Sequence, residues 1–421
     1  MDTSGSQGTS AGRWYYGWNI VAAASVITLM TVGMRMGVGP FFMPIIEDLG
    51  FSRSVFSGIV AVGMLFYGLA MPLAGWLVGR IGTRGVLLIG IAIVVLSTWW
   101  TINATTPWTM LMAFGVMLST GLAFTSPVAM TAILTKWFNR RRGMALFFLA
   151  TGSMAGIAVL TPLFALLISW IGWRWTMMCY ALVFAVLTVP AALWIFKENA
   201  PVNGDAPLPR SSKEKAKPAP AVMTCTFGEA VRTTPFWKIC AGLFACGFSM
   251  NLLGTHGIPM LEDRGFSTMT ASGGIGTIGL VAIFSTLVLG RIADRIPRRL
   301  LLATIYIVRG VGFLALLVVM TPFQLYLVAA IAGLVWAGSL AMASAILADT
   351  YGVRLVGVLY GWSYLGHQIG AAISSWFGGW GYEHLDSHWP AFGAAAVLLF
   401  FAGWVSLKLP GRQLNSRLVS A

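Results

Sequence analysis

Val32-Gly-Met-Arg-Met-Gly37 places a full positive charge inside an apolar run that extends from Trp18 to Met43. A run of this length crosses a bilayer as a helix. A guanidinium at the centre of a membrane helix costs at least about 2.5–3.5 kcal/mol, and it persists only where it faces partners or a water-filled cavity. Arg35 therefore predicts a membrane protein whose interior is polar at this point.

The composition indicates a polytopic membrane protein. Of the 421 residues, 57% are hydrophobic and 10% are charged, whereas soluble domains carry about 25% charged residues. The net charge of +14 comes from basic residues scattered over short loops, which indicates topology signals rather than a nucleic-acid surface. The four cysteines show no Cys-x-x-Cys spacing, so we expect no disulfide framework, no metal site and no cofactor.

Twelve apolar stretches are long enough to be membrane helices. They cover residues 18–43, 54–78, 85–103, 108–134, 144–170, 175–196, 237–260, 272–293, 300–320, 323–347, 355–381 and 389–408. A charged, Pro-rich segment between the sixth and seventh stretches cannot bury a core. We therefore predict an all-α polytopic membrane protein. Its parts are an N-terminal six-helix bundle (1–196), a cytoplasmic linker (197–235) and a C-terminal six-helix bundle (236–421).

The basic residues also define an orientation. With both termini in the cytoplasm, 22 of the 27 Lys and Arg residues lie on that side, and only Arg53, Arg174 and Arg264 lie outside. The positive-inside rule requires such an asymmetry. We predict a multi-pass protein of the cell inner (plasma) membrane with both termini in the cytoplasm.

An internal repeat supports the two bundles. Pro44-Ile-Ile-Glu-Asp-Leu-Gly-Phe-Ser52 recurs as Pro259-Met-Leu-Glu-Asp-Arg-Gly-Phe-Ser267, a shift of 215 residues, and the same shift carries Gly75 onto Gly290. Equal spacing at two landmarks indicates duplicated six-helix units. Parallel repeats with a binding site between them, near the middle of the membrane, are a known plan for transporters.

The basic loop after the second helix of each unit resembles a superfamily signature. Gly290-Arg-Ile-Ala-Asp-Arg-Ile-Pro-Arg-Arg299 and Gly75-Trp-Leu-Val-Gly-Arg-Ile-Gly-Thr-Arg84 resemble the GxxxDRxGRR loop of the major facilitator superfamily. The resemblance implies 12 transmembrane helices in two six-helix bundles. Asp294, Arg295 and Arg84 are then candidates for a breakable cytoplasmic latch that gates the carrier. The alternative is that these basic residues only anchor the topology.

Three more motifs resemble the monocarboxylate and oxalate/formate transporter branch of that superfamily. They are Tyr16-Gly-Trp-Asn19, Trp137-Phe-Asn-Arg-Arg-Arg-Gly143 and Thr234-Pro-Phe-Trp237. The first helix fits the monocarboxylate pattern without a gap, which places Arg35 next to the position where the animal members carry a functional Lys. We add Arg142, from the second motif, to the candidate gating residues.

The chain departs from these patterns at three positions. Gly79 replaces the Asp of the first latch loop, and Thr286 stands where related carriers place an Arg four residues before the latch Gly. His367 stands where the oxalate carrier has a Lys. A substrate-binding Arg at position 286 therefore cannot be carried over, and the identity of the acid stays open.

Arg35 and Arg309 are the two charges inside the spans, and both are candidate substrate-binding residues. A guanidinium can hold a carboxylate through two parallel hydrogen bonds, which suits anion recognition. The alternative for Arg35 is a side chain that snorkels to the outer interface, about 10 Å away at 1.5 Å per residue. The alternative for Arg309, near the middle of the ninth span, is a structural role in which it bonds carbonyls or hydroxyls of neighbouring helices.

A polar stripe marks the eleventh span. Tyr360, Tyr364 and His367 lie at i, i+4 and i+7, so they share one face of a helix. We expect Tyr364 and His367 to contact the substrate and His367 to carry a proton, since histidine titrates near physiological pH. The alternative is an interhelical hydrogen bond. Tyr67 and Trp336, in the second and tenth spans, are candidates for shaping an apolar substrate pocket, or for packing alone.

The acidic residues indicate the sign of the substrate. All 13 lie in loops, termini or helix ends, so two arginines without a mid-span carboxylate should create a positive central field that attracts anions. We predict a secondary transporter of a small organic anion, a monocarboxylate moved with a proton, which works as a monomer among membrane lipids. We find no nucleophile–base pair in the sequence, so we do not expect an enzyme. An organic-anion exchanger and a non-transporting sensor remain as alternatives.

Overall fold

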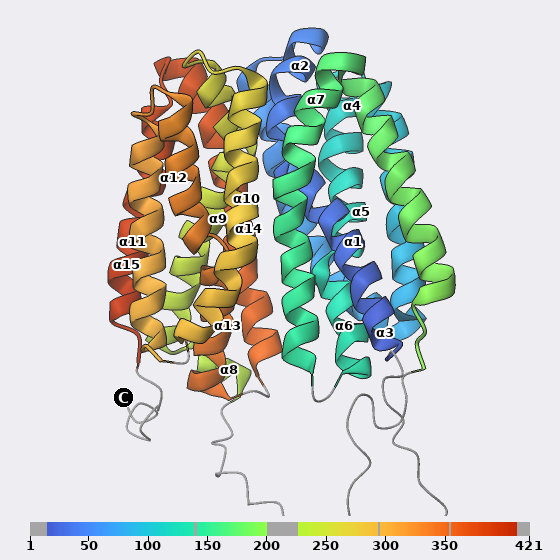
Figure 1. Ribbon diagram of the computed structural model, residues 1–421, viewed down its shortest axis with the longest axis vertical. Helices are drawn as coiled ribbons and strands as arrows, with labels where there is room; N and C mark the ends of the chain where they lie inside the picture. The colour runs from blue at the N-terminus through green and yellow to red at the C-terminus, as the bar shows by residue number, and fades with distance from the viewer. Residues whose placement is uncertain (1–14, 139–140, 200–225, 294, 353–354, 411–421) are drawn as a thin grey trace, which may run out of the picture.

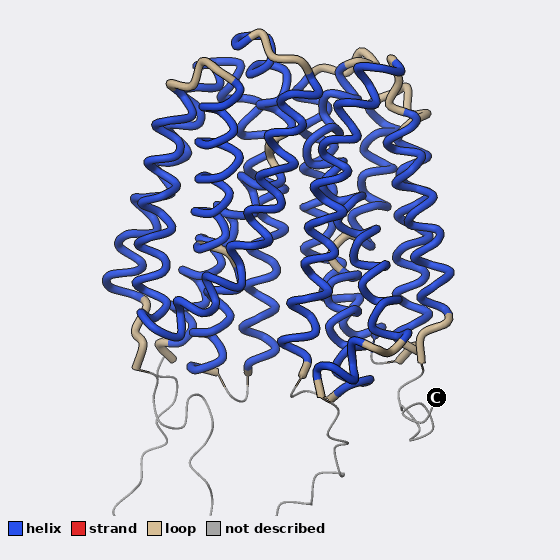
Figure 2. The backbone as a smooth tube through the Cα atoms, turned by 180° about the vertical axis from the view of Figure 1, so that it is seen from behind, coloured by secondary structure: helices blue, strands red, loops and turns tan. Residues whose placement is uncertain are grey.

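The computed structural model describes residues 15–138, 141–199, 226–293, 295–352 and 355–410. Figure 1 shows the helices standing side by side in two groups, and Figure 2 shows that the regular elements of these ranges are helices, without a strand. The N-terminal bundle contains α1 (Gly17–Met36), α2 (Gly39–Leu49), α3 (Arg53–Ile102), α4 (Pro107–Met110), η1 (Leu111–Leu118), α5 (Ser119–Phe124), α6 (Pro127–Trp137), α7 (Arg142–Pro190) and η2 (Ala191–Ile195).

The C-terminal bundle follows a short helix, α8 (Phe227–Val231). It contains α9 (Thr234–Glu262), α10 (Thr268–Ala293), α11 (Arg298–Leu316), α12 (Pro322–Val335), α13 (Gly338–Tyr351), α14 (Val356–Leu385) and α15 (Trp389–Leu407). Each bundle is built around a cluster of buried apolar side chains, and a few side chains of the facing bundle join each cluster, among them Met36 of α1 and Ala371 of α14.

The described helices account for twelve membrane crossings. Nine helical stretches within the described ranges are long and apolar enough to cross a membrane. Two of them, residues 53–102 and 143–195, are 50 and 53 residues long, more than twice the ~20 residues that one crossing needs, and each contains a reversal. The thirty residues of α14 are more polar but long enough to cross. The predicted twelve-helix fold in two bundles is therefore confirmed.

Two glycines make the reversals inside α3 and α7. Gly82 (φ 77°, ψ 169°) and Gly172 (φ 77°, ψ 167°) have the same non-helical backbone, at the positions where the second helix of each pair begins. This region of φ and ψ is essentially restricted to glycine. The two glycines therefore join consecutive spans without a longer loop.

The first, fourth and tenth predicted spans are interrupted, which corrects the prediction of continuous helices. The breaks lie at residues 37–38, 125–126 and 336–337. Pro127 opens α6 after the extended Ser126, because the residue before a proline is pushed out of the helical region. Pro40, the second residue of α2, has no N–H with which to continue the hydrogen bonding of α1. A broken span leaves backbone groups available for side chains or ligands.

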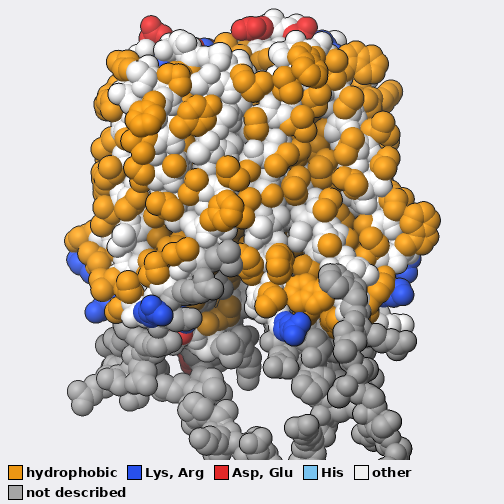
Figure 3. Space-filling model, in the orientation of Figure 1, with side chains coloured by type: hydrophobic (Ala, Val, Ile, Leu, Met, Phe, Trp, Pro, Cys, Tyr) orange, Lys and Arg blue, Asp and Glu red, His pale blue; other side chains and the backbone are white. Residues whose placement is uncertain are grey.

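The two ends of the molecule differ in charge. Figure 3 shows an apolar belt, with Lys and Arg side chains at one rim and Asp and Glu side chains at the opposite rim. We call the end where α1 begins and α15 ends the basic face, and the opposite end the acidic face. An apolar belt between two charged rims fits a protein that spans a bilayer.

The predicted linker, residues 197–235, is only partly described. It contains α8, which begins with a capping box: Thr226 Oγ1 accepts from the Glu229 N–H, and the Glu229 carboxylate accepts from the Thr226 N–H. Residues 200–225 lie outside the described ranges. The division of the chain at residues 196 and 236 stays a prediction.

Candidate functional site

Arg35 lies at the interface between the two bundles. It belongs to the last turn of α1, directly before the break at residues 37–38, and its side chain is 8% exposed. Its Nη2 donates a hydrogen bond of 3.0 Å to Oε1 of Gln368 in α14, and its Cζ lies 4.5 Å from the centre of the Tyr67 ring in α3. The guanidinium thus reaches the opposite bundle instead of snorkelling toward the acidic face.

The charge of Arg35 is only partly satisfied. Its Nε is buried and has no hydrogen-bond partner within the described ranges, and no described carboxylate forms an ion pair with it. Tyr364 of α14 also interacts with it electrostatically. A buried guanidinium that keeps a spare donor and lacks a counter-charge can receive an anion.

A small cavity adjoins this guanidinium. It measures about 20 Å³ and is lined by Arg35, Tyr67 and mostly apolar side chains of α1, α3, η1 and α5, among them Met34, Met64 and Phe114. One water molecule needs roughly 10–15 Å³ by this measure. In this conformation the cavity, whose lining residues all belong to the N-terminal bundle, therefore has room for a water, and a larger guest requires its walls to move apart.

Sequence reasoning missed Gln368, which joins Arg35 to His367. Gln368 is fully buried; its Oε1 lies 3.0 Å from Arg35 Nη2 and 3.0 Å from His367 Nδ1, and its Nε2 donates to the Met64 carbonyl at 3.4 Å. A glutamine inside an apolar span beside the predicted His367 was the available signal, since a buried amide needs partners.

His367 lies where the polar stripe predicted it, inside the protein. Its ring stacks on Tyr364 with centroids 4.9 Å apart, and Tyr364 lies 6.0 Å from Tyr360. The Nε2 atom of His367 is buried without a hydrogen-bond partner in the described ranges. The structure therefore brings Arg35, Tyr67, Tyr364 and His367 together.

Arg309 is held differently, away from Arg35. It is 1% exposed, its Nη2 donates to the carbonyls of Val335 (3.0 Å) and Trp336, and its Nη1 contacts Cys246 Sγ at 3.2 Å. Because these carbonyls flank the break between α12 and α13, the guanidinium caps an interrupted helix. Trp336 lies beside it, with the Arg309 Cζ 5.1 Å from its ring. This geometry corresponds to the structural alternative for Arg309, and a substrate contact by Arg309 or Trp336 stays a prediction.

Two of the four predicted gating residues, Arg84 and Arg295, are described, and both lie at the basic face. Arg84 donates from Nε to the Ala192 carbonyl and from Nη2 to the Leu193 carbonyl, both inside the N-terminal bundle. Arg295 is exposed. Asp294 and the side chain of Arg142 lie outside the described part of the chain, so a latch made by these four residues stays a prediction.

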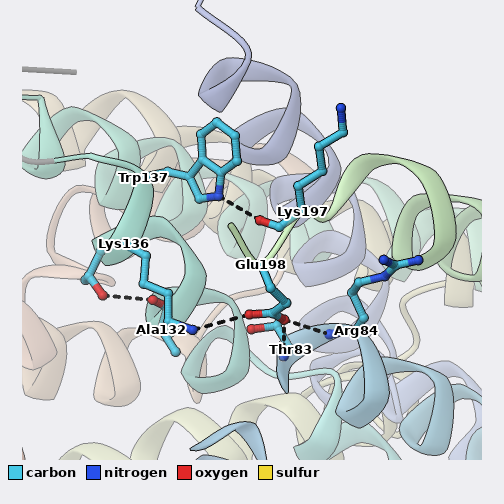
Figure 4. A network of polar contacts seen from close by, with 8 residues as sticks. Thr83, Arg84, Ala132, Lys136, Trp137, Lys197 and Glu198 are labelled. Atoms are coloured by element: carbon cyan, nitrogen blue, oxygen red, sulfur yellow. Dashed lines mark hydrogen bonds and ion pairs between the residues drawn. The ribbon is translucent and has the colours of Figure 1, made fainter. Parts of the chain in front are cut away.

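Glu198 supplies a carboxylate near the loop in which Gly79 replaces the expected Asp. Its Oε1 accepts hydrogen bonds from the backbone N–H groups of Thr83 and Arg84, and its Oε2 pairs with Lys136 Nζ at 3.3 Å (Figure 4). The two N–H groups open the helix that follows Gly82, where an acceptor is needed. Glu198 therefore ties the end of the sixth span to the turn between the second and third.

An ion pair between the bundles occurs at the acidic face. Arg53 of α3 donates two hydrogen bonds to Asp263, from Nη1 to Oδ2 (2.5 Å) and from Nη2 to Oδ1 (2.8 Å), and His388 Nε2 lies 2.8 Å from Asp263 Oδ2. The Glu383 carboxylate accepts from the Ser54 N–H. The ion pairs at the basic face that the described ranges contain lie within one bundle. In this conformation an ion pair therefore joins the two bundles at the acidic face.

Comparisons with known proteins show what the chain is similar to. Residues 24–317 and 277–417 match the family model of the Major Facilitator Superfamily. The oxalate:formate antiporter of Oxalobacter formigenes is 24% identical over 411 residues, which are 94% of this chain and 93% of that protein. Monocarboxylate transporter 11 of Homo sapiens is 26% identical over 313 residues, which are 72% of this chain and 62% of that protein.

A solved structure is similar over nearly the whole chain. It is a bacterial homologue of the human lysosomal transporter Spinster, in an inward-facing and unoccupied conformation, with a TM-score of 0.68 and 20% identity. The match covers 94% of this chain and 97% of the solved chain. At this identity the likeness concerns the fold alone.

Proposed function

Because this chain belongs to the Major Facilitator Superfamily and is therefore a membrane transporter, we propose that it carries a small monocarboxylate across the membrane together with a proton. The observation that carries the proposal is Arg35. It is a buried guanidinium between the bundles, with an unpaired Nε and no carboxylate partner among the described residues. An anion that takes up these donors removes the cost of an uncompensated buried charge.

The number of available charges favours a monoanion. Arg309 already donates to two backbone carbonyls, to Ser339 and to Cys246, so Arg35 is left as the cation for a substrate. The cavity beside it is largely apolar, which suits a carboxylate with an apolar body. A dicarboxylate would leave its second charge unpaired in this surrounding, at a cost of several kcal/mol. The likeness to a monocarboxylate transporter supports the same class.

The mechanism follows from neutralisation. In the empty carrier the Arg35 charge has an amide oxygen as its partner; in the loaded carrier it has a carboxylate. An Arg35–carboxylate ion pair is better compensated than Arg35 beside an amide oxygen, so the bundles rock about the loaded site. His367, which shares Gln368 with Arg35, is the group that we assign to carry the proton.

The direction of the molecule in the membrane follows from its two faces. The basic face shows Lys and Arg side chains along its rim, and the positive-inside rule places such a face in the cytoplasm. The acidic face, with the Arg53–Asp263 pair, would then face outward. We propose the plasma membrane as the site of action, with both termini on the cytoplasmic side.

Uptake by purified protein in liposomes tests this function. We expect an inward proton gradient to drive accumulation of at least one of formate, acetate, lactate or benzoate, and oxalate to be accumulated poorly. Arg35→Gln should abolish uptake, whereas Arg264→Gln, which loses an arginine that bonds a backbone carbonyl near the acidic face, should retain it. Full uptake by Arg35→Gln contradicts the proposed role of Arg35.

The same liposomes separate the rivals. Uptake that requires an anion inside the vesicle and ignores the proton gradient would identify an exchanger, as the likeness to an oxalate:formate antiporter allows. Binding of an acid without any transport would indicate a sensor. Either outcome would rule out proton symport and would leave the proposal of an anion-binding site at Arg35 standing.

A further inference from the structure

We propose that Gln368 is the positioning residue that couples the anion site to the proton site: the bound carboxylate displaces its amide oxygen from Arg35, and that oxygen then serves His367 alone. The inference rests on the proposed function, because it assumes that Arg35 receives the carboxylate. Nothing in the sequence pattern assigns a role to Gln368, which lies beside the polar stripe and not on it.

The partners of Gln368 determine how its amide is turned. A guanidinium can only donate hydrogen bonds and a carbonyl can only accept them. The side-chain oxygen must therefore face Arg35 Nη2, and the side-chain nitrogen must face the Met64 carbonyl, as the structure has them. Gln368 thus connects α1 and α3 of one bundle with α14 of the other through a single oriented amide.

The same oxygen determines the tautomer of His367. His367 Nδ1 lies 3.0 Å from Oε1 of Gln368, and an amide oxygen only accepts, so Nδ1 carries the hydrogen. In neutral His367 the lone pair is then on Nε2, which is buried and makes no hydrogen bond of ordinary geometry within the described ranges, with the Cys246 thiol interacting with the same imidazole. Nε2 is therefore the atom that takes up the proton.

The charged and titratable groups around His367 show how an anion at Arg35 would favour protonation of His367. Titratable or charged groups close to it or to its partners come from five helices: Arg35 (α1), Tyr67 (α3), Cys246 (α9), Tyr306 and Arg309 (α11), and Tyr360 and Tyr364 (α14). α13 adds the neutral Ser339 hydroxyl. No carboxylate is among them within the described part of the chain. Arg35 and Arg309 are the charged groups among them, so a carboxylate at Arg35 would bring a negative charge that favours an imidazolium at His367.

Displacement at Gln368 adds a second, local effect. In the empty carrier its oxygen is divided between Arg35 and His367. When a carboxylate takes Arg35, the oxygen is left to the Nδ1–H of His367, and a hydrogen bond to a charged donor is stronger than one to a neutral donor. Anion binding and protonation at Nε2 thus favour each other, as linkage between two sites requires.

Gln368 is also placed to pass this change to the bundle interface. A Cβ added at Gly68 of α3 would lie 2.9 Å from Gln368 Cβ, so α3 and α14 are in close contact at this level. An amide that leaves Arg35 must find its new position within this contact. The change of partner therefore occurs where the two bundles separate during transport.

Calorimetry on the purified, full-length protein tests the coupling. Binding of acetate, lactate and benzoate is measured between about pH 6 and about pH 8, where these acids are ionised, in two buffers of different ionisation enthalpy, so that protons taken up with the acid are counted. Wild type should take up close to one proton per acid, and the apparent Kd should fall by up to roughly tenfold per pH unit on acidification.

Two variants and a control separate coupling from binding. Gln368→Met keeps the length of the side chain without an acceptor, so an acid should still bind while proton uptake falls clearly below that of wild type, because only the direct effect of the anion's charge on His367 remains. Gln368→Glu gives Arg35 a permanent carboxylate, so affinity for the acids should fall at least roughly 100-fold. Asn251→Leu removes another buried amide that bonds to α14, through the Ala371 carbonyl and Ser375, and should keep both affinity and proton uptake.

Each result decides between the two proposals. If wild type binds none of the three acids, the proposed function fails and the coupling fails with it. If wild type binds an acid with proton uptake and Gln368→Met takes up protons equally, the function stands and the role of Gln368 is overturned. Binding without proton uptake by wild type overturns symport and coupling while leaving the anion site. Should Gln368→Met not fold, intact acid affinity in Gln368→Glu also overturns the proposal.

Discussion

Arg35 and Arg309 are both buried arginines of membrane helices, but their hydrogen bonding differs. Arg309 donates to two carbonyls at a helix break and to two further side chains. Arg35 donates to one amide across the bundle interface, and Nε of both arginines has no partner within the described ranges. A buried charge without its partners lowers stability, so the under-satisfied Arg35 is the one expected to serve binding.

Removing each charge should therefore affect folding in opposite ways. Arg309→Met leaves the Val335 and Trp336 carbonyls without a donor and should lower the stability by at least about 2 kcal/mol. Arg35→Met removes an under-satisfied charge and should leave the apparent Tm in detergent unchanged or higher. Thermal unfolding of the two variants beside wild type measures this. A loss of Tm in Arg35→Met equal to that in Arg309→Met would assign Arg35 to structure.

At the scale of single elements, glycine decides where long helices reverse. Gly82 and Gly172 occupy matching places in α3 and α7 and share one backbone conformation. The Glu198 carboxylate accepts from the N–H groups that follow Gly82, while a Cβ at Gly172 would meet nothing within 4 Å. A side chain at position 172 would therefore cause backbone strain alone. A side chain at position 82 would cause the same strain and would also crowd the Glu198 carboxylate.

Alanine at these positions should destabilise the protein. Gly172→Ala should cost about 1–3 kcal/mol from backbone strain alone, and Gly82→Ala should cost more, because its Cβ would lie 2.8 Å from Glu198 Oε1. Gly79→Ala is the matched control: Gly79 is helical and a Cβ there would meet no atom within 4 Å, so it should be neutral or stabilising. Apparent Tm values of the three variants in one detergent give the order directly.

At the scale of the whole molecule, the repeated acidic motif makes an asymmetric set of ion pairs. The shift of 215 residues relates Asp48 to Asp263. Asp48 pairs with Arg174 inside the N-terminal bundle, whereas Asp263 pairs with Arg53 across the two bundles. The position related to Arg53 is Thr268, which carries no charge, so one inter-bundle ion pair forms where strict symmetry would give two.

Breaking this pair should open the acidic face. With spin labels at Thr106 and Met320, which lie in loops at the acidic face of opposite bundles, Asp263→Asn or Arg53→Ala should lengthen and broaden the label distance. Asp48→Asn, which removes the related carboxylate from within one bundle, should leave the distance unchanged. Equal distances in Asp263→Asn and Asp48→Asn would show that the pair does not hold the bundles together.

The pH dependence of closure follows from the same carboxyl. Burial alone would raise the pKa of Asp263, but hydrogen bonds from Arg53 and His388 and the charge of Arg53 outweigh it and hold the pKa well below the ordinary value of 3.8. A depressed pKa means that the ion pair contributes fully above that ordinary value and is lost as the pH falls through the lowered one. Between about pH 5 and pH 8, Asp263 should therefore add no pH dependence to the label distance. A distance that changes in this range in wild type but not in Asp263→Asn would refute this assignment.

The sequence alone determined the membrane class and the twelve crossings, and it predicts the sign of the substrate. These follow from the length and polarity of each span and from the position of every charge, which are local properties of the chain. It also identified Arg35, Tyr67, Tyr364 and His367, because a polar side chain in an apolar span needs partners. The reversals at Gly82 and Gly172 lie between predicted spans. The sequence therefore predicted where they occur, but not the backbone conformation of the two glycines.

Only the tertiary structure decided how these residues are connected. Gln368 accepts from Arg35 across 333 positions of sequence, Arg53 meets Asp263 across 210, and Arg309 caps a break in a span predicted to be continuous. Such contacts depend on how two bundles pack against each other, and residue spacing within one helix carries no information about its neighbour. The division of roles between the two arginines therefore emerged only when the bundles were placed side by side.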